Sequence, residues 1–189
     1  MRCFIAIDIS EEIKKKLIEL QSLLAKKAGI KDDDVKWVAA DTMHLTLKFL
    51  GDVPDNQIES LCHAVEDVAV RHDRFDINIG SIGHFGSERS AKVLWVGAGQ
   101  SSDELCQLYK DLEQYLAHKG WSREARKFVG HLTLCRVKRF KAGKRIAEEA
   151  AHYADCKLGT ISADSLRVYE SKLRARGPVY TLLGKYELK

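Results

Sequence analysis

Hydrophobic and polar positions follow two spacings along this chain, one typical of strands and one typical of helices. Residues 2–9 alternate as a strand does, and Ser10 followed by Glu11 and Glu12 is typical of a helix N-cap with acids in the first turn. Apolar residues then recur at helical spacing until the pattern fades near Gly29: Ile13, Leu17, Leu20 and Leu24. The N-terminal part of the chain is therefore predicted to form a strand followed by a helix.

The same two spacings predict the elements that follow. Helices are expected from Pro54–Asp55 to near His72, from a capping box at Ser101–Glu104 to Gly120, and from Ile146 to Tyr153 after a basic loop. Strands are expected over residues 43–50, 75–79, 91–96, 127–137, 165–169 and 179–188. Gly83, Gly86 and Ser87 indicate a turn region between two of these strands. Strands interspersed with helices predict an α+β fold.

One tetrapeptide occurs twice, as His44-Leu45-Thr46-Leu47 and as His131-Leu132-Thr133-Leu134. Alternate residues of a strand point to the same face of its sheet, so in each copy the His and the Thr project one way and the leucines the other. Each copy is therefore half of a candidate site. Two halves that face each other would offer two imidazoles and two hydroxyls to one small anion.

The repeat also predicts the domain organisation. The two copies lie close to half the chain length apart, and the order strand, helix, strand, strand, helix, strand recurs around each. No linker rich in Pro, Gly or Ser separates them. We expect a single bilobal, duplicated domain over residues 1–189, with two mostly antiparallel sheets facing a central groove and helices outside.

Composition limits the class of protein. A chain of 189 residues with 45% hydrophobic content can bury one substantial core. No stretch approaches about eighteen uncharged apolar residues, and Asp8 interrupts the N-terminal apolar run, unlike in a signal peptide. The five cysteines are scattered without a C-x-x-C pair, which argues against a disulfide framework and a zinc site. We expect a cytoplasmic monomer with reduced thiols and no membrane association.

Positive charge is concentrated in two C-terminal stretches, although the formal net charge is only +4. The first stretch holds Arg136, Lys138, Arg139, Lys141, Lys144 and Arg145, and the second holds Arg167, Lys172, Arg174 and Arg176. Either stretch fits solvated loops and helix faces as well as it fits a phosphate-binding rim. Charge alone leaves both interpretations open.

The repetition of the histidine points to catalysis. A lone strand histidine is usually structural, but strand propensity does not favour His at the same position of two separate strands. The usual imidazole pKa, about 6.5, lets one ring be neutral while another is protonated near neutral pH. His44 and His131 can therefore act as an acid and a base on a phosphodiester. No Asp/Glu cluster at ligand spacing accompanies either copy, so we expect no metal or other cofactor.

Thr46, Thr133 and a cation would stabilise the charge that builds on the non-bridging oxygens of such a phosphodiester. Arg136 is the favoured cation. Along an uninterrupted strand Arg136 would point away from His131 and Thr133, so it needs a bulge or a strand end to turn inward. A merely solvated Arg136 is the alternative.

The two H-x-T-x motifs, within residues 44–51 and 131–137, resemble those of the 2H phosphoesterase superfamily. The chain is most similar to the RNA 2′,3′-cyclic phosphodiesterase branch, also called 2′-5′ RNA ligase. The opening residues 2–7 (RCFIAI) and the closing residues 177–180 (GPVY) also fit that branch, so the resemblance covers essentially the whole chain.

The resemblance implies metal-independent opening of a 2′,3′-cyclic phosphate at an RNA end to a 2′-phosphate. His44 and Thr46 then form one half of the site, and His131 and Thr133 the other. We assign His44 as the acid that protonates O3′ and His131 as the base that activates water. In the reverse direction a 5′-hydroxyl replaces water and a 2′-5′ junction forms.

Aromatic side chains could stack on the terminal base. The candidates are Phe4, Phe49 and the pair His84-Phe85, but core packing is the more common role of Phe4 and Phe49. The other histidines, His63, His72, His118 and His152, have no partner motif and are expected at the surface.

Two alternatives to an RNA phosphodiesterase remain open. One is a non-catalytic module that captures RNA ends in the same groove. The other is a phosphoesterase for a small cyclic nucleotide. A binding module needs no acid and base and would keep its affinity after His-to-Asn changes.

Overall fold

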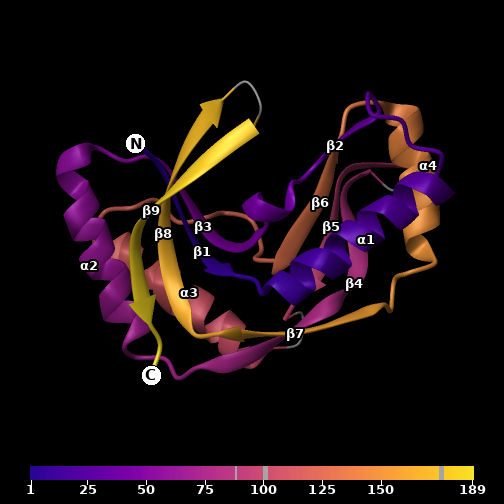
Figure 1. Cartoon of the computed structure of the whole chain (residues 1–189). Coiled ribbons are helices and arrows are strands. Elements are labelled where there is room, and N and C mark those ends of the chain that lie inside the picture. Colours follow the sequence, from indigo (N-terminus) through magenta and orange to yellow (C-terminus); the bar gives the residue numbers. More distant parts are fainter. Residues whose placement is uncertain (88, 100–101, 175–176) are drawn as a thin grey trace.

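The computed structural model describes residues 1–87, 89–99, 102–174 and 177–189 (Figure 1). The strands are β1 (Arg2–Asp8), β2 (Val35–Trp37), β3 (His44–Asp52), β4 (Phe75–Ser87), β5 (Ser90–Ala98), β6 (His131–Val137), β7 (Lys157–Ala163), β8 (Ser165–Arg174) and β9 (Gly177–Glu187). The helices are α1 (Glu11–Lys27), α2 (Ile58–Ala69), α3 (Asp103–His118) and α4 (Phe140–Ala151), with 3₁₀ turns η1 (Ala40–Thr42) and η2 (Asp55–Gln57).

The strands form two antiparallel sheets. Sheet A has the order β3-β1-β8-β9, and sheet B has the order β2-β6-β5-β4-β7. Each adjacent pair of strands with a described register is antiparallel. The predicted α+β class with two antiparallel sheets is therefore confirmed.

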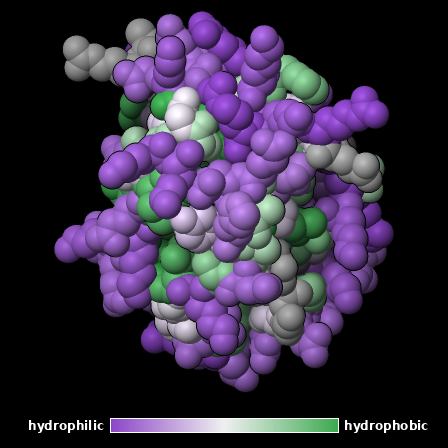
Figure 2. Space-filling view, turned by 90° about the vertical axis from the view of Figure 1, so that its right-hand side faces the viewer, coloured by the Kyte–Doolittle hydropathy of each residue, from purple (hydrophilic) through white to green (hydrophobic). Residues whose placement is uncertain are grey.

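Helices cover the outer sides of both sheets. Helices α2 and α3 contact each other, and α2 packs on β8 and β9 of sheet A. Helix α4 packs on β4, β5 and β6 of sheet B, while α1 contacts α4 and β7 (Figure 1). The molecular face on the α1 and α4 side is mainly hydrophilic, with only small scattered apolar groups (Figure 2). This pattern is that of amphipathic helices whose apolar stripes face the sheets.

The two sheets do not correspond to consecutive halves of the chain. Strands β8 and β9 complete sheet A together with β1 and β3, whereas β4 from the first half belongs to sheet B. The helices cross over as well, since α1 follows a strand of sheet A but packs beside sheet B. Sheet A is thus built from both ends of the sequence, whereas the strands of sheet B lie between residues 35 and 163.

Helices α1 and α3 each begin after a capping serine, whereas α2 begins at Ile58 after the 3₁₀ turn η2, a few residues later than the sequence predicts. The Ser10 hydroxyl accepts a hydrogen bond from the Ile13 N–H at 3.4 Å and caps α1. Ser102 caps α3 by accepting from the Leu105 N–H at 3.1 Å. The capping box was expected to start at Ser101, which lies outside the described residues.

Four elements differ from the sequence prediction. Strand β4 runs on to Ser87, so Gly83 and Gly86 lie inside a strand rather than in a turn. Helix α4 begins at Phe140, so the expected basic loop forms its first turns. Strand β7 was not expected, because its burial is confined to Ile161 and Ala163 and leaves little apolar alternation to detect. The strand expected from residue 127 begins at His131.

Candidate active site

The two H-L-T-L segments form the first four residues of β3 and of β6. The leucines are fully buried or nearly so, while His44, Thr46, His131 and Thr133 are half-buried on the opposite face. Strands β3 and β6 belong to different sheets but contact each other where the two sheets meet. The predicted division between a leucine side and a His/Thr side is therefore confirmed in both copies.

Both strands contain a β-bulge at the same place in the motif. In β3 the pairing with β1 skips Leu47, since Thr46 pairs with Ala6 and Lys48 with Ile5. In β6 the pairing with β5 skips Leu134 in the same way. Two consecutive residues are consequently buried in each strand, and the next residue returns to the His/Thr face.

The bulges decide where Arg136 and Phe49 point. Arg136 lies on the face of His131 and Thr133, as the candidate role required. Phe49 occupies the equivalent position in β3 and is 68% exposed, so its predicted core packing is wrong. Phe4 is buried as predicted, yet its ring lies directly against the ring of His44.

Aromatic rings surround His44. The Phe4 ring stacks on the imidazole with centroids 4.6 Å apart, and the Tyr180 ring meets it edge-on at 5.2 Å. The Tyr169 ring lies 6.4 Å away. Tyr180 belongs to β9, the far edge of sheet A from β3, so the sheet curls around this face. Rings packed this closely hold the imidazole in one orientation.

A carboxylate also lies beside His44. Asp8 is the cross-strand partner of His44 in the β1–β3 ladder. Its carboxylate accepts hydrogen bonds from the Arg167 guanidinium and, at 2.8 Å, from the Tyr169 hydroxyl. Arg167 belongs to the second basic stretch, which the sequence left open between a solvated face and a phosphate-binding rim, and its charge is engaged by Asp8.

His131 is held by a backbone bond and two aromatic neighbours. Its Nδ1 lies 2.7 Å from the carbonyl oxygen of Val129, which can only accept, so Nδ1 carries the proton. The Phe85 ring meets the imidazole edge-on at 5.0 Å, and the Trp95 ring lies 6.1 Å away. Trp95 needs the glycine opposite it, because a Cβ on Gly83 would lie 2.2 Å from the indole.

His84 and Phe85, the two neighbouring candidates for base stacking in β4, point to opposite faces of sheet B. Phe85 is 38% exposed and points to the His131 face. His84 pairs with the fully buried Leu94, so it points to the helix side of sheet B, and its Nδ1 is buried without a hydrogen-bond partner. Of the two, only Phe85 can take part in this site.

The two imidazoles differ in their charged neighbours. Burial lowers the pKa of His44 to about 4, while Asp8 and a hydrogen bond with the Thr42 backbone act in the raising direction. Burial also lowers the pKa of His131 from 6.5; the Val129 hydrogen bond opposes this shift, and the Arg136 charge adds to it. Both rings are therefore mainly neutral at pH 7 in the unliganded protein.

The charge of Arg136 acts on both half-sites. It lowers the pKa of the Tyr180 hydroxyl in sheet A, which burial raises, and it lowers the pKa of His131 in sheet B. Tyr180 in turn meets the His44 ring edge-on. Arg136 thus supplies positive charge to both half-sites.

The family is identified by a sequence model that matches the chain twice. The model, described as LigT-like phosphoesterase, matches residues 7–95 and then residues 96–180, with one H-L-T-L segment in each match. The chain belongs to the LigT-like phosphoesterase family. This membership confirms the resemblance to the 2H phosphoesterases, and the double match agrees with the duplication inferred from the repeat.

Two relatives of this LigT-like phosphoesterase are both named RNA 2′,3′-cyclic phosphodiesterase. An RNA 2′,3′-cyclic phosphodiesterase from Thermotoga maritima is 35% identical over 188 residues, covering 97% of this chain and 93% of the relative. One from Methanocaldococcus jannaschii is 29% identical over 186 residues, covering 98% of this chain and all of the relative. Crystalline E. coli LigT complexed with 3′-AMP superposes with a TM-score of 0.76 at 26% identity, covering 99% and 97% of the two chains.

Several residues near the histidines of this LigT-like phosphoesterase were not found from the sequence. Asp8 was noticed only as an acid inside an apolar run, which was itself a signal for a functional carboxylate. Tyr169, Tyr180 and Trp95 carry no local signal, because strand pairing over long sequence distances brings them to the site.

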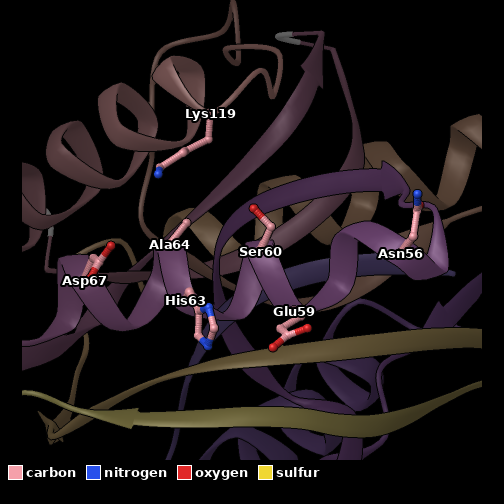
Figure 3. Close-up of a pocket in the computed structure, with 7 residues that line it drawn as sticks. All are labelled: Asn56, Glu59, Ser60, His63, Ala64, Asp67 and Lys119. Carbon is pink, nitrogen blue, oxygen red and sulfur yellow. The ribbon is translucent and has the colours of Figure 1, made fainter.

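The remaining histidines of the LigT-like phosphoesterase lie outside this site. His63, His118 and His152 are exposed, and His72 pairs with Asp111 at 3.1 Å. A pocket of about 320 Å³ lies between α2 and the end of α3, where Lys119 extends toward the α2 residues Ser60, Ala64 and Asp67 (Figure 3). This pocket is on the helix side of sheet A, away from His44 and His131.

Across residues 1–87, 89–99, 102–174 and 177–189, no three His, Cys, Asp or Glu side chains are grouped so that they could hold a metal ion. Among the helices described for this chain, none has the length and apolar character needed to cross a membrane.

Proposed function

We propose that this protein hydrolyses 2′,3′-cyclic phosphate ends of RNA to 2′-phosphate ends, with His44 and His131 as the acid and the base. One observation carries the proposal: each of two contacting strands presents an imidazole and a hydroxyl on one face, and Arg136 lies on the same face as His131 and Thr133. The names of the relatives support the substrate. The 3′-AMP bound to E. coli LigT is consistent with a nucleotide site in this fold.

In the proposed step, water attacks phosphorus while the bond from phosphorus to O3′ breaks. The base takes a proton from the water, and the acid gives a proton to O3′. The products are a 2′-phosphomonoester and a free 3′-hydroxyl. In the reverse direction a 5′-hydroxyl of a second RNA replaces the water, which would make a 2′-5′ junction.

Local geometry supports His131 as the base. Its Nδ1–H donates to the Val129 carbonyl, so in the neutral ring Nε2 has a free lone pair that can accept a proton. The nearby Arg136 disfavours protonation of the resting ring. His131 would therefore begin the reaction in the form that a base requires.

The charge of Asp8 supports His44 as the acid. Asp8 favours the imidazolium form of this ring, whereas no carboxylate is among the groups that shift His131. Burial has the larger effect in the unliganded protein, so protonation of His44 would accompany binding of the phosphate anion. The assignment therefore rests on the charged neighbours and not on burial, which lowers both pKa values.

The remaining roles belong to hydroxyls and one cation. Thr46 and Thr133 would donate to the non-bridging oxygens, and Arg136 would neutralise the charge that develops there. All of this chemistry uses side chains of this chain, so the reaction would proceed without a metal ion. Adding EDTA should therefore leave the rate unchanged, and loss of activity with rescue by a divalent ion would contradict the proposal.

We place this activity in RNA processing within the cytoplasm, with residues 1–189 working as one bilobal unit and as a monomer. All five cysteines are unpaired, as is usual in a reducing compartment. Size-exclusion chromatography with light scattering would test the monomeric state, and a dimer mass would contradict it.

The decisive assay for activity uses a short oligonucleotide with a 2′,3′-cyclic phosphate. The expected product is the 2′-phosphate, identified by mass and by resistance to an enzyme specific for 3′-phosphates. Binding without turnover, retained after His44→Asn and His131→Asn, would instead support an RNA-end-binding module. Turnover restricted to a cyclic mononucleotide would support the small-metabolite alternative.

A further inference from the structure

Beyond the sheet, β8 and β9 continue as a two-stranded ribbon. Strand β1 pairs with β8 only as far as Glu170, whereas β8 and β9 stay paired to Arg174 and Gly177. Residues 171–174 and 177–180 are therefore hydrogen-bonded only to each other in the described ladders, and they project from sheet A (Figure 1). We call these eight residues the ribbon.

One side of the ribbon continues the face that carries His44. Tyr169 bonds Asp8 on that face, and Leu173 follows Tyr169 at even spacing. Cross-strand partners share a face, so Tyr180 and Pro178, the partners of Ser171 and Leu173, lie on the same side. Tyr180 touches the His44 ring, so the ribbon begins at the proposed site of catalysis.

This side of the ribbon is apolar and open to solvent. Leu173 is 72% exposed, and Pro178 beside it is half-buried. An isolated two-stranded ribbon has no core of its own to bury such side chains, so they serve no packing role that the structure shows. The opposite side carries Lys172, which pairs with Glu170 at 2.9 Å, together with Arg174 and Val179.

We propose that the Leu173–Pro178 side of the ribbon binds the base of the nucleotide that precedes the cyclic-phosphate end. Apolar side chains can cover the face of a nucleobase whatever its identity, and exposed Leu173 with half-buried Pro178 beside it offers such a surface. The charge near this face fits an RNA strand, because the charge of Arg136 acts on Tyr180, which lies on the same side at the base of the ribbon. The ribbon then selects oligonucleotides over cyclic mononucleotides.

This inference rests on the proposed function and specifies its substrate class. The test compares kcat/KM for a cyclic-ended trinucleotide with kcat/KM for a 2′,3′-cyclic mononucleotide. Leu173→Ser should lower the trinucleotide value about 10-fold, which is the scale of one lost stacking contact, and change the mononucleotide value far less. Val179→Ser is the matched control, since Val179 is an exposed apolar residue on the other side of the same ribbon.

Three results would overturn the inference: equal losses on both substrates, no loss on either, or the same loss from Val179→Ser. If the wild-type protein opens neither substrate, the proposed function fails. In that event binding of a fluorescent cyclic-ended trinucleotide, measured by anisotropy, still tests the ribbon. Weaker binding by Leu173→Ser but not by Val179→Ser would support it, and equal dissociation constants would overturn it.

Discussion

The two half-sites share a backbone plan and differ in their chemical surroundings. Both β3 and β6 place His and Thr on one face, bury two leucines, and bulge at the second leucine. After the bulge the copies diverge. β3 continues with Lys48 and Phe49, and β6 continues with Cys135 and Arg136.

The two histidines have neighbours of opposite charge. The sheet A histidine has a carboxylate and stacked rings beside it, while the sheet B histidine has a guanidinium. Duplication alone would give two equivalent imidazoles. Neighbours outside the tetrapeptide make them unequal, and an acid/base pair needs that inequality.

The largest expected effect comes from removing either histidine. His44→Ala and His131→Ala should each lower kcat/KM about 10²- to 10⁴-fold, because each removes one proton-transfer partner. The double variant should be little worse than the poorer single one, since the two groups act together. His63→Ala is the matched control, because His63 is an exposed residue of α2. Near-normal turnover by His44→Ala or by His131→Ala in a steady-state assay would remove the replaced histidine from the mechanism.

The next comparison concerns the buried residue after each bulge. Lys48 is only 5% exposed and pairs with Glu113, and it also donates to the Ser122 carbonyl at 2.8 Å. Lys48→Ala leaves the Glu113 carboxylate buried without its cation and should cost about 3–5 kcal/mol in urea unfolding. Cys135→Ala, at the equivalent position, should cost only about 1–2 kcal/mol.

A double variant sharpens this comparison. Lys48→Met with Glu113→Leu removes both charges and should recover most of the lost stability, because no lone charge remains buried. If the double variant is as unstable as Lys48→Ala, the loss comes from packing and not from the uncompensated carboxylate.

Oxygen and nitrogen donors at the phosphate should have smaller effects than the histidines. Thr46→Ala and Thr133→Ala should each cost about 2–4 kcal/mol of transition-state stabilisation, and Thr→Ser should be milder. Arg136→Ala should fall in the same range, with partial recovery in Arg136→Lys. If Ser and Ala replacements gave the same kcat/KM at either threonine, its hydroxyl would not be the group that matters.

The smallest effect is a shift in the pH profile. A base must be neutral and an acid protonated, so kcat/KM should be bell-shaped in pH, with one limb at the pKa of each histidine. Since burial lowers both values, to about 4 for His44, both limbs should lie below pH 6.5. The limbs of kcat should lie at higher pH, because a bound phosphate favours each imidazolium.

Asp8→Asn tests whether the Asp8 carboxylate contributes to the difference between the two histidines. Asp8 raises the pKa of His44, so its loss should move the limb of kcat/KM that His44 sets to still lower pH. Tyr169→Phe is the control, because it removes a hydrogen bond to Asp8 but keeps the carboxylate charge. Equal profiles for Asp8→Asn and the wild type would show that the carboxylate does not tune this histidine.

The sequence predicted the parts of the site that depend on local pattern. Strand alternation placed His44, Thr46, His131 and Thr133 on their shared faces, and the need for a bulge before Arg136 followed from the same spacing. Phe49 was misplaced because the matching bulge in β3 was not considered.

What the sequence missed depends on contacts between distant segments. Gly83 is typical of a turn in the sequence, yet it lies in strand β4, where the Trp95 indole opposite leaves no room for a Cβ. Tyr180 reaches His44 only because β9 closes sheet A and the sheet curls. No local pattern encodes either contact.

The most direct test of unequal histidines uses a cyclic phosphodiester substrate whose 3′ leaving group needs no protonation. Such a substrate should restore much of the rate lost in His44→Ala, because it no longer needs an acid at O3′. It should do little for His131→Ala, which still lacks the base that activates water. Rescue of His131→Ala alone would reverse the two roles, and equal rescue of both would contradict a division of labour between the two copies.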